Sequence, residues 1–326
     1  MKNAINILVR SLVHQGMSMT SRLISSNKLS ILIYHQVLPV KDPLRFSEPD
    51  KKEFAQQMQI ISKYFNPIGL PEALELIKQG KLPKNSICVT FDDGYKNNLS
   101  IAQPILQNYK IPATVFVATS YIEGDNMWND NVIEFFRKRL HKDINLKSFS
   151  LGSISNCSIE NALKIIPKII KQLKYSSLKE RSNAINELYH KHSEHISKSK
   201  MMDREEIREL FEKGITIGAH THEHPILKVL SKSEQAQQIA YGKELLEQII
   251  VQPVELFAYP NGKFGIDFDE TTVEIVKDLK FSAAVTTDWG TSTTKTNKFK
   301  LLRFTPWSKN KLKFHFQLLR NYYKYK

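Results

Sequence analysis

The chain has 326 residues, of which 41% are hydrophobic, and a formal net charge of +14 at pH 7. This length and composition exclude a disordered chain and allow one large domain or two medium ones. The apolar runs fall short of the ~18 residues that a transmembrane helix needs, so no membrane-spanning segment is expected. The two cysteines, Cys88 and Cys157, lack the spacing of a zinc site and fit a reducing compartment.

The N-terminal segment, residues 1–30, is basic and amphipathic. It carries four basic and no acidic residues, and apolar residues recur with helical spacing at Ile5, Leu8, Val9, Leu12 and Val13. The apolar run from Ile5 to Val9 is too short for a secretory signal, so we expect a cytoplasmic protein. Two interpretations of the helix stay open: a surface helix packed on the body, or a helix lying on the inner face of a membrane.

Short β-rich runs alternate with helical patterns along residues 31–310, which we take as the main domain. Strands are expected at 31–35, 86–91, 113–118, 215–219, 255–259 and 283–287. Helices are expected near 51–65, 71–80, 98–109, 203–213, 233–250 and 269–280. Pro71 opens the second of these helices, and Asp203 with Glu206 forms a capping box for the fourth. Alternating strands and helices predict an α/β fold with a parallel sheet.

Residues 130–200 interrupt this alternation. They contain helical patterns and no clear strand, so we expect a helical insertion there. The insertion is basic, with 14 basic and 6 acidic residues in 131–200.

The C-terminal segment, residues 311–326, is a basic tail with interleaved aromatic residues. Residues 294–326 carry ten basic and no acidic side chains. A tail of this kind suits an anionic membrane surface or an anionic glycan, and it equally suits a solvated helix. No nucleic-acid-binding motif is recognised, so no nucleic-acid partner is expected.

Polar residues stand at the exits of five expected strands. They are His35, the Asp92–Asp93 pair, His220, Tyr259 and Asp288. In parallel α/β barrels the active site forms where the carboxyl ends of the strands meet. The sequence therefore predicts that polar side chains from five strands lie together at one end of the barrel.

Two motifs supply the residue types of a metal-dependent hydrolase. Asp93 with His220 and His224 makes a set of one carboxylate and two imidazoles, which holds a divalent metal and leaves room for a water. Asp92 is then free to take a proton. Each motif alone is weak, because Asp-Gly is common in turns and the histidines, His222 included, could be surface residues. A cation beside the two adjacent carboxylates would allow both to ionise.

The motifs Thr90-Phe91-Asp92-Asp93-Gly94 and His220-Thr221-His222-Glu223-His224-Pro225 resemble the first two motifs of the polysaccharide deacetylase family, also known as NodB-homology domains or carbohydrate esterase family 4. The resemblance runs from about residue 30 to 125 and again from about 203 to 305. The run from Ile31 to Val37, with Tyr34-His35 inside it, resembles the opening motif of the poly-N-acetylglucosamine deacetylase branch. The resemblance implies a deformed (β/α) barrel of about seven parallel strands.

The resemblance also implies roles for individual residues. Asp92 would be the general base, Asp93, His220 and His224 the metal ligands, and His35 the general acid. The segment 257–262 resembles the third motif, in which the backbone N–H of Tyr259 would help hold the oxyanion. The segment 287–289 resembles the fourth, in which Asp288 would orient a catalytic partner and Trp289 would line the acetyl pocket. The metal would be zinc, with cobalt or nickel also compatible.

One departure from the family pattern concerns the general base. The third motif normally begins with an arginine that pairs with the base, whereas Phe257 stands there in this chain. Lys263 is one candidate substitute, and Arg303 near the last strand region is expected to contact a sugar.

These features together predict a metal-dependent hydrolase that removes N-acetyl groups from an amino sugar in a polysaccharide or lipid-linked glycan. The alternatives are a glycan-binding protein with a decayed site and an amidase for another acyl amide.

Overall fold

The computed structural model describes residues 2–197, 199–306 and 308–324, with side chains described for neither 2–10 nor 324. Seven parallel strands form the main sheet in the order β1 (Ser30–Tyr34), β3 (Ser86–Phe91), β4 (Ala113–Val117), β7 (Thr216–Ala219), β8 (Leu256–Ala258), β9 (Ala283–Trp289) and β10 (Leu301–Arg303). A short β2 (Asn66–Pro67) pairs with the start of β3.

The sheet closes on itself where the chain leaves β10. Phe304 N donates to Ile31 O at 2.8 Å, and Ile33 N donates to Phe304 O at 3.1 Å. These bonds join the last strand to the first, so the expected α/β barrel of about seven parallel strands is confirmed.

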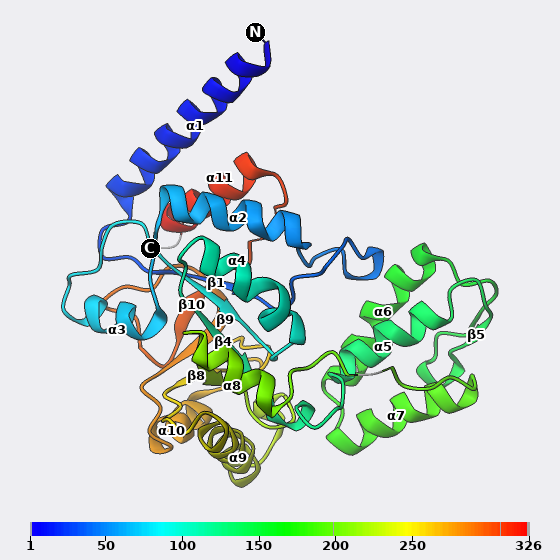
Figure 1. Cartoon of the computed structure of the whole chain (residues 1–326). Coiled ribbons are helices and arrows are strands. Elements are labelled where there is room, and N and C mark those ends of the chain that lie inside the picture. The colour runs from blue at the N-terminus through cyan, green and yellow to red at the C-terminus, as the bar shows by residue number, and fades with distance from the viewer. Residues whose placement is uncertain (1, 198, 307, 325–326) are drawn as a thin grey trace.

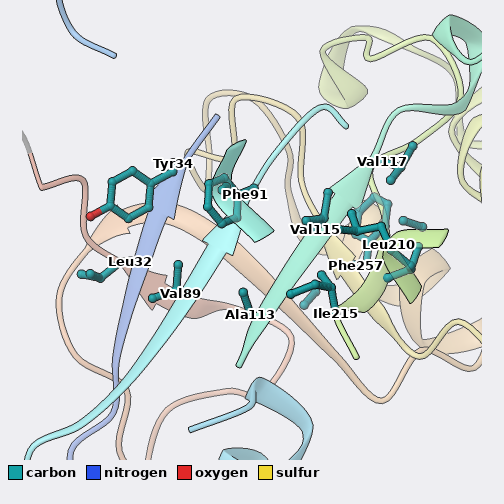
Figure 2. Packing of buried hydrophobic residues seen from close by; sticks show 14 of the residues in the cluster. Leu32, Tyr34, Val89, Phe91, Ala113, Val115, Val117, Leu210, Ile215 and Phe257 are labelled. Atoms are coloured by element: carbon teal, nitrogen blue, oxygen red, sulfur yellow. The ribbon is translucent and has the colours of Figure 1, made fainter. Parts of the chain in front are cut away.

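Strand sequences explain the barrel, because buried parallel strands need apolar residues on both faces. All six residues of β3 are buried, as are all five of β1 and of β4. Leu32, Val89 and Ala113 lie side by side on these neighbouring strands (Figure 2). Burying a side chain such as Val or Leu stabilises the fold by about 1.5–3 kcal/mol.

Six helices cover the barrel: α2 (Lys51–Tyr64), α3 (Leu70–Lys78), α4 (Gln103–Asn108), α8 (Arg204–Glu212), α9 (Lys232–Ile250) and α10 (Glu270–Asp278). The predicted capping box of α8 is present, with Asp203 accepting from Glu206 N. A π-helical turn, Asn98–Ala102, precedes α4.

The insertion lies to one side of the barrel (Figure 1). It contains α5 (Trp128–Lys138), α6 (Ile159–Lys174) and α7 (Leu178–Lys191) around its own apolar core. The sequence pattern predicts no strand in this segment, yet β5 (Ile144–Asn145) and β6 (Ser153–Ile154) form a small antiparallel pair. Each has only two residues, too few for an alternating pattern to stand out.

The first helix, α1 (Lys2–Ile24), and the last, α11 (Lys311–Lys324), pack together above α2. Their contact includes a hydrogen bond of 2.7 Å between the Nδ1 atoms of His14 and His315. Phe314, Leu318 and Tyr322 are fully buried, so α11 is part of the body rather than a free tail. Within the described residues, no helix combines the length and the apolarity that crossing a bilayer requires.

This histidine pair predicts a loss of stability in acid. Burial is the largest cause that lowers both pKa values. The charges of Lys311 and Lys63 lower the pKa of His14 further, and the charge of His14 helps to lower the pKa of His315 from 6.5 to about 4. A lowered folded-state pKa means that the unfolded chain takes up protons first, so the stability is complete above pH 6.5 and is lost as the pH falls. We expect His315 alone to cost about 2 kcal/mol of unfolding free energy between pH 7 and pH 5.

Urea unfolding at a series of pH values measures this loss. The variant His315→Phe keeps a ring in the aromatic cluster with Tyr64 and Phe65. It should show a shallower decline below pH 6.5, and an equally steep decline would contradict the assignment to this pair.

Candidate active site

The carboxyl ends of the strands bring the predicted polar residues to one mouth of the barrel. His35 follows β1, Asp92 and Asp93 follow β3, and His220 follows β7. His224 returns to the same place through the loop after β7. Parallel strands all end at the same face, which is why residues nearly 190 positions apart meet.

Asp93, His220 and His224 form a compact ligand set. Asp93 Oδ1 lies 3.6 Å from the Nε2 atom of each histidine, and the three ligand atoms lie within 4.8 Å of one another. Asp93 Oδ1 is buried and has no hydrogen-bond partner. His220 Nδ1 is 2.7 Å from the carbonyl of Ala258, which can only accept. Nδ1 therefore carries the proton, and Nε2 offers its lone pair toward Asp93, as a metal ligand requires.

The electrostatics of this set also fit a cation. Burial, together with nearby carboxylates, raises the pKa of Asp93 to about 7. Burial lowers the pKa of His220 to about 4 and that of His224 well below its usual value, so both rings are neutral. Imidazoles bind a divalent ion in their neutral form. A bound cation would also stabilise the ionised form of the Asp93 carboxylate, whose pKa is raised without it. The residues present thus fit the divalent metal that the resemblance implies.

Asp92 is fixed by a partner that the sequence did not reveal. Its two oxygens accept bidentate hydrogen bonds, each 2.7 Å, from Nη1 and Nη2 of Arg303. Burial acts to raise the pKa of Asp92, but Arg303 lowers it to about 2. Arg303 is 0% exposed, so the expected sugar contact is corrected: this residue holds the predicted base. Arg303, rather than Lys263, therefore replaces the arginine that the family pattern has where this chain has Phe257.

His35 lines a cavity of about 230 Å³ together with Asp93. Burial acts to lower the pKa of His35, but Asp93, Glu48 and Asp92 outweigh it and raise the pKa. Glu48 lines the same cavity, and its negative charge raises the pKa of His35. Its carboxylate accepts a hydrogen bond from Gln36 N at 3.2 Å. A raised pKa favours the protonated imidazole, which a proton donor requires. Sequence reasoning missed Glu48, which lies in a loop without a motif.

The insertion contributes to this cavity through the start of α5. Asn129 and Asp130 are among the lining residues, and Asn129 Oδ1 and Asp130 Oδ2 are buried without a hydrogen-bond partner. Arg45 fixes α5 by binding Asp130 Oδ1 at 2.6 Å and Glu134 Oε1 at 2.7 Å. The helical insertion thus forms one wall of the site.

The backbone N–H of Tyr259 is not free to bind an oxyanion, contrary to the prediction. Its N–H donates to Val285 O of β9 at 3.3 Å, and its hydroxyl donates to Phe299 O at 2.9 Å. The ring stacks on Phe268 at 3.7 Å and is fully buried. Since an amide has one N–H and this one belongs to the sheet, the predicted oxyanion contact is corrected, and Tyr259 is a core residue.

Asp288 and Trp289 lie at the end of β9. Asp288 Oδ2 accepts from Phe264 N at 3.2 Å, which ties the loop after β8 to this strand. Trp289 is 41% exposed and packs edge-on against Phe304, with ring centroids 5.6 Å apart. The carboxylates that act on His35 are those of Asp93, Glu48 and Asp92. The role of Asp288 in orienting a catalytic partner stays a prediction, as does the acetyl pocket at Trp289.

The loop that carries the histidines is held in an uncommon backbone conformation. Thr221 and His224 have φ values of 65° and 52°, and Asp93 has 77°. Left-handed conformations are costly for non-glycine residues, above all for a β-branched threonine, and persist where the surroundings determine them. Neighbours do so here, because Tyr121 Oη and Arg181 Nη2 both donate to Glu223 O. His222 points away from the ligand set, with Nδ1 2.9 Å from Thr119 Oγ1.

Gly242 of α9 backs this loop, and its substitution should disturb the site from behind. A Cβ atom there would lie 2.9 Å from the carbonyl carbon and oxygen of Thr221. We expect Gly242→Ala to destabilise the fold by about 1–2 kcal/mol through overpacking. Displacing the loop should also weaken zinc binding by about 10–100-fold. Urea unfolding and a zinc titration measure the two effects.

Gly16 of α1 provides the matched control. It is also a helical glycine, but a Cβ atom there would meet nothing within 4 Å. Gly16→Ala should leave zinc affinity unchanged. Equal zinc affinity in Gly242→Ala and Gly16→Ala would show that the loop is not held by close contact with α9.

Comparison with known proteins assigns the chain to a family. The profile of the polysaccharide deacetylase family matches residues 79–284, more than half of the chain. The chain therefore belongs to the polysaccharide deacetylase family.

Relatives and solved structures agree with this assignment. YxkH of Bacillus subtilis (strain 168), provisionally named a polysaccharide deacetylase, is 23% identical over 81% of this chain, and the match spans 66% of YxkH, just under two thirds. A poly-β-1,6-N-acetyl-D-glucosamine N-deacetylase of Staphylococcus aureus (strain MSSA476) is 42% identical over 66 residues, which are 20% of this chain and 23% of that protein.

Two solved structures share the fold. The deacetylase PplD of Streptococcus pyogenes, solved with acetate, has a TM-score of 0.59 at 19% identity and covers 90% of this chain and 98% of PplD. IcaB from Ammonifex degensii has a TM-score of 0.58 at 20% identity and covers 90% of this chain and 97% of IcaB. At these identities the likeness shows a common barrel.

Proposed function

We propose that this protein is a metal-dependent hydrolase that removes N-acetyl groups from an amino sugar in a polysaccharide or lipid-linked glycan and releases acetate. The observation that carries the proposal is the convergence of Asp93, His220 and His224 beside an Asp92 held by Arg303. Membership of the polysaccharide deacetylase family supports the reaction, and the short match to a poly-N-acetylglucosamine deacetylase supports the substrate class.

The chain supplies the proton transfers that amide hydrolysis needs. Arg303 keeps Asp92 ionised at neutral pH and fixes its orientation, so that it accepts a proton from the attacking water. His35 donates a proton to the departing nitrogen, because a free amide anion is too basic to leave. The products are acetate and a free amine on the sugar.

A bound divalent ion, zinc or alternatively cobalt or nickel, polarises the acetamide carbonyl and acidifies water. Asp93, His220 and His224 would hold it. Asn129 Oδ1 and Asp130 Oδ2, which are buried without a hydrogen-bond partner, suit sugar hydroxyl groups in the same cavity.

The rival proposal of a glycan-binding protein with a decayed site has lost its main support. The absence of the third motif's arginine favours this rival, but in this chain Arg303 pairs with Asp92 instead. The intact set of Asp93, His220 and His224 favours catalysis.

An acetate-release assay tests the proposal. Zinc-loaded protein is incubated with β-1,6- and β-1,4-linked N-acetylglucosamine oligomers, and Asp92→Asn serves as the inactive control. Acetate release by the parent protein, without release by Asp92→Asn, supports deacetylation. Binding of the oligomers without acetate release would favour the binding protein, and release from other acyl amides but not from the oligomers would favour the amidase.

A further inference from the structure

Helix α1 packs against the body with its polar side. His14 and Ser21 are buried, at 8% and 0% exposure, and Ser18 Oγ donates to Tyr64 O of α2 at 3.1 Å. Just after the helix, Ser25 Oγ donates to Asn85 Oδ1 at 2.8 Å. The side that an ordinary surface helix presents to water is here the side in contact with the protein.

The opposite side of α1 is apolar and exposed. Leu12 is 57% exposed, Met19 70% and Leu23 80%. At 100° per residue these three positions fall within about 40° of one another and form one stripe along the helix. Ile5 and Leu8 continue the stripe in the sequence, although their side chains lie outside the described residues. Figure 1 shows the N-terminal half of α1 extending away from the barrel.

Helix α11, which packs against α1, also exposes charged and aromatic side chains. Its outward positions are Lys313, Phe316, Arg320 and Tyr323, which recur at three- and four-residue spacing. Phe316 is 56% exposed and Tyr323 72%. Basic residues next to exposed aromatic and aliphatic ones are the composition of helices that lie in the interface of a membrane.

We propose that α1 and α11 together form a docking surface for an anionic lipid bilayer, with α1 lying in the plane of the interface. The apolar stripe would enter the boundary between headgroups and acyl chains, and the lysines and arginines would face the phosphates. In this arrangement both helices would lie in the interface and neither would cross the bilayer.

The charge of this surface favours an anionic bilayer over a second copy of the chain as its binding partner. Residues 1–30 and 294–326 carry four and ten basic side chains and no acidic one. Two copies meeting through this surface would bring like charges together, which opposes association, whereas an anionic bilayer complements them. The surface is independent of the proposed reaction, since α1 and α11 carry none of the residues assigned to the active site.

Co-sedimentation of the full chain with lipid vesicles tests the proposal. The vesicles are phosphatidylcholine with or without about one third phosphatidylglycerol, at rising salt. We expect binding to the anionic vesicles only, with a partition coefficient that falls at least about tenfold in high salt. Leu12→Ser/Leu23→Ser and Lys313→Gln/Arg320→Gln should each lower it about tenfold or more.

The control variant replaces two exposed apolar residues elsewhere on the molecule. Val229→Ser/Ile266→Ser removes side chains that are 56% and 57% exposed outside this surface and should bind vesicles like the parent. Urea unfolding checks that each variant is folded. Parent-like binding by Leu12→Ser/Leu23→Ser would overturn the placement of the contact. A dimer in light scattering that this variant abolishes, with no vesicle binding by the parent, would show that a second copy covers the stripe and would overturn the lipid proposal.

Discussion

Asp93→Ala is expected to abolish metal retention and to lower acetate release by on the order of 10³-fold. Asp93 supplies the one carboxylate of the ligand set, and its Oδ1 lies 3.6 Å from both histidine Nε2 atoms. Without it, the ligand set keeps only two neutral imidazoles and loses its one carboxylate ligand for a divalent ion. Elemental analysis of the purified variant and the acetate assay measure the two losses.

His222→Ala is the matched control for this prediction. His222 belongs to the same loop, but its Nδ1 is bonded to Thr119 and its ring packs on Tyr241 with centroids 4.5 Å apart. The control should keep its metal and most of its activity. A metal content in Asp93→Ala equal to that of the parent would show that the ligand assignment is wrong, however the activity behaves.

Much of the site could be predicted because its residues directly follow apolar strands. Asp92 and Asp93 follow β3 and His220 follows β7, and the parallel order of the strands brings their ends to one face. Periodicity is a local signal, so it locates strand ends without any knowledge of long-range contacts.

The partner of Asp92 had no such local signal. Arg303 lies 211 positions further along the chain, and it reaches Asp92 only because β10 closes the barrel against β1. The family pattern places this arginine at the position of Phe257, far from Arg303 in the sequence. Glu48 and Asp130 escaped notice for the same reason, since each comes from a segment whose position depends on tertiary contacts such as Arg45 with α5.

The orientation of α1 shows a different limit of sequence patterns. Helical spacing locates the apolar stripe that includes Leu12, but it cannot say whether the stripe faces the body. Apolar faces normally turn to the core. In α1 the hydrogen bonds of Ser18 and His14 with α2 and α11 fix the polar face inward instead.

Arg303→Met is expected to destabilise the fold by about 3–5 kcal/mol, because it leaves the buried carboxylate of Asp92 without its counter-charge. Arg303 and Asp92 are 0% and 2% exposed, so water cannot replace the guanidinium. Burial would then raise the pKa of Asp92, since Arg303 is the largest influence that lowers it. Acetate release should fall, and its acid limb should move to higher pH. Urea unfolding and the pH profile of acetate release measure these effects.

The double variant Arg303→Met/Asp92→Asn separates charge from packing. It removes both members of the ion pair, so part of the lost stability should return, because no uncompensated charge stays buried. Activity should not return, since the proton acceptor is gone. Arg303→Lys tests geometry in turn: an ammonium keeps the charge but cannot bind both oxygens of Asp92 in the same plane, so stability should recover more than activity does. If Arg303→Met unfolded at the same urea concentration as the parent and released acetate at the parent's rate, the bidentate pair would not be what holds Asp92 in place.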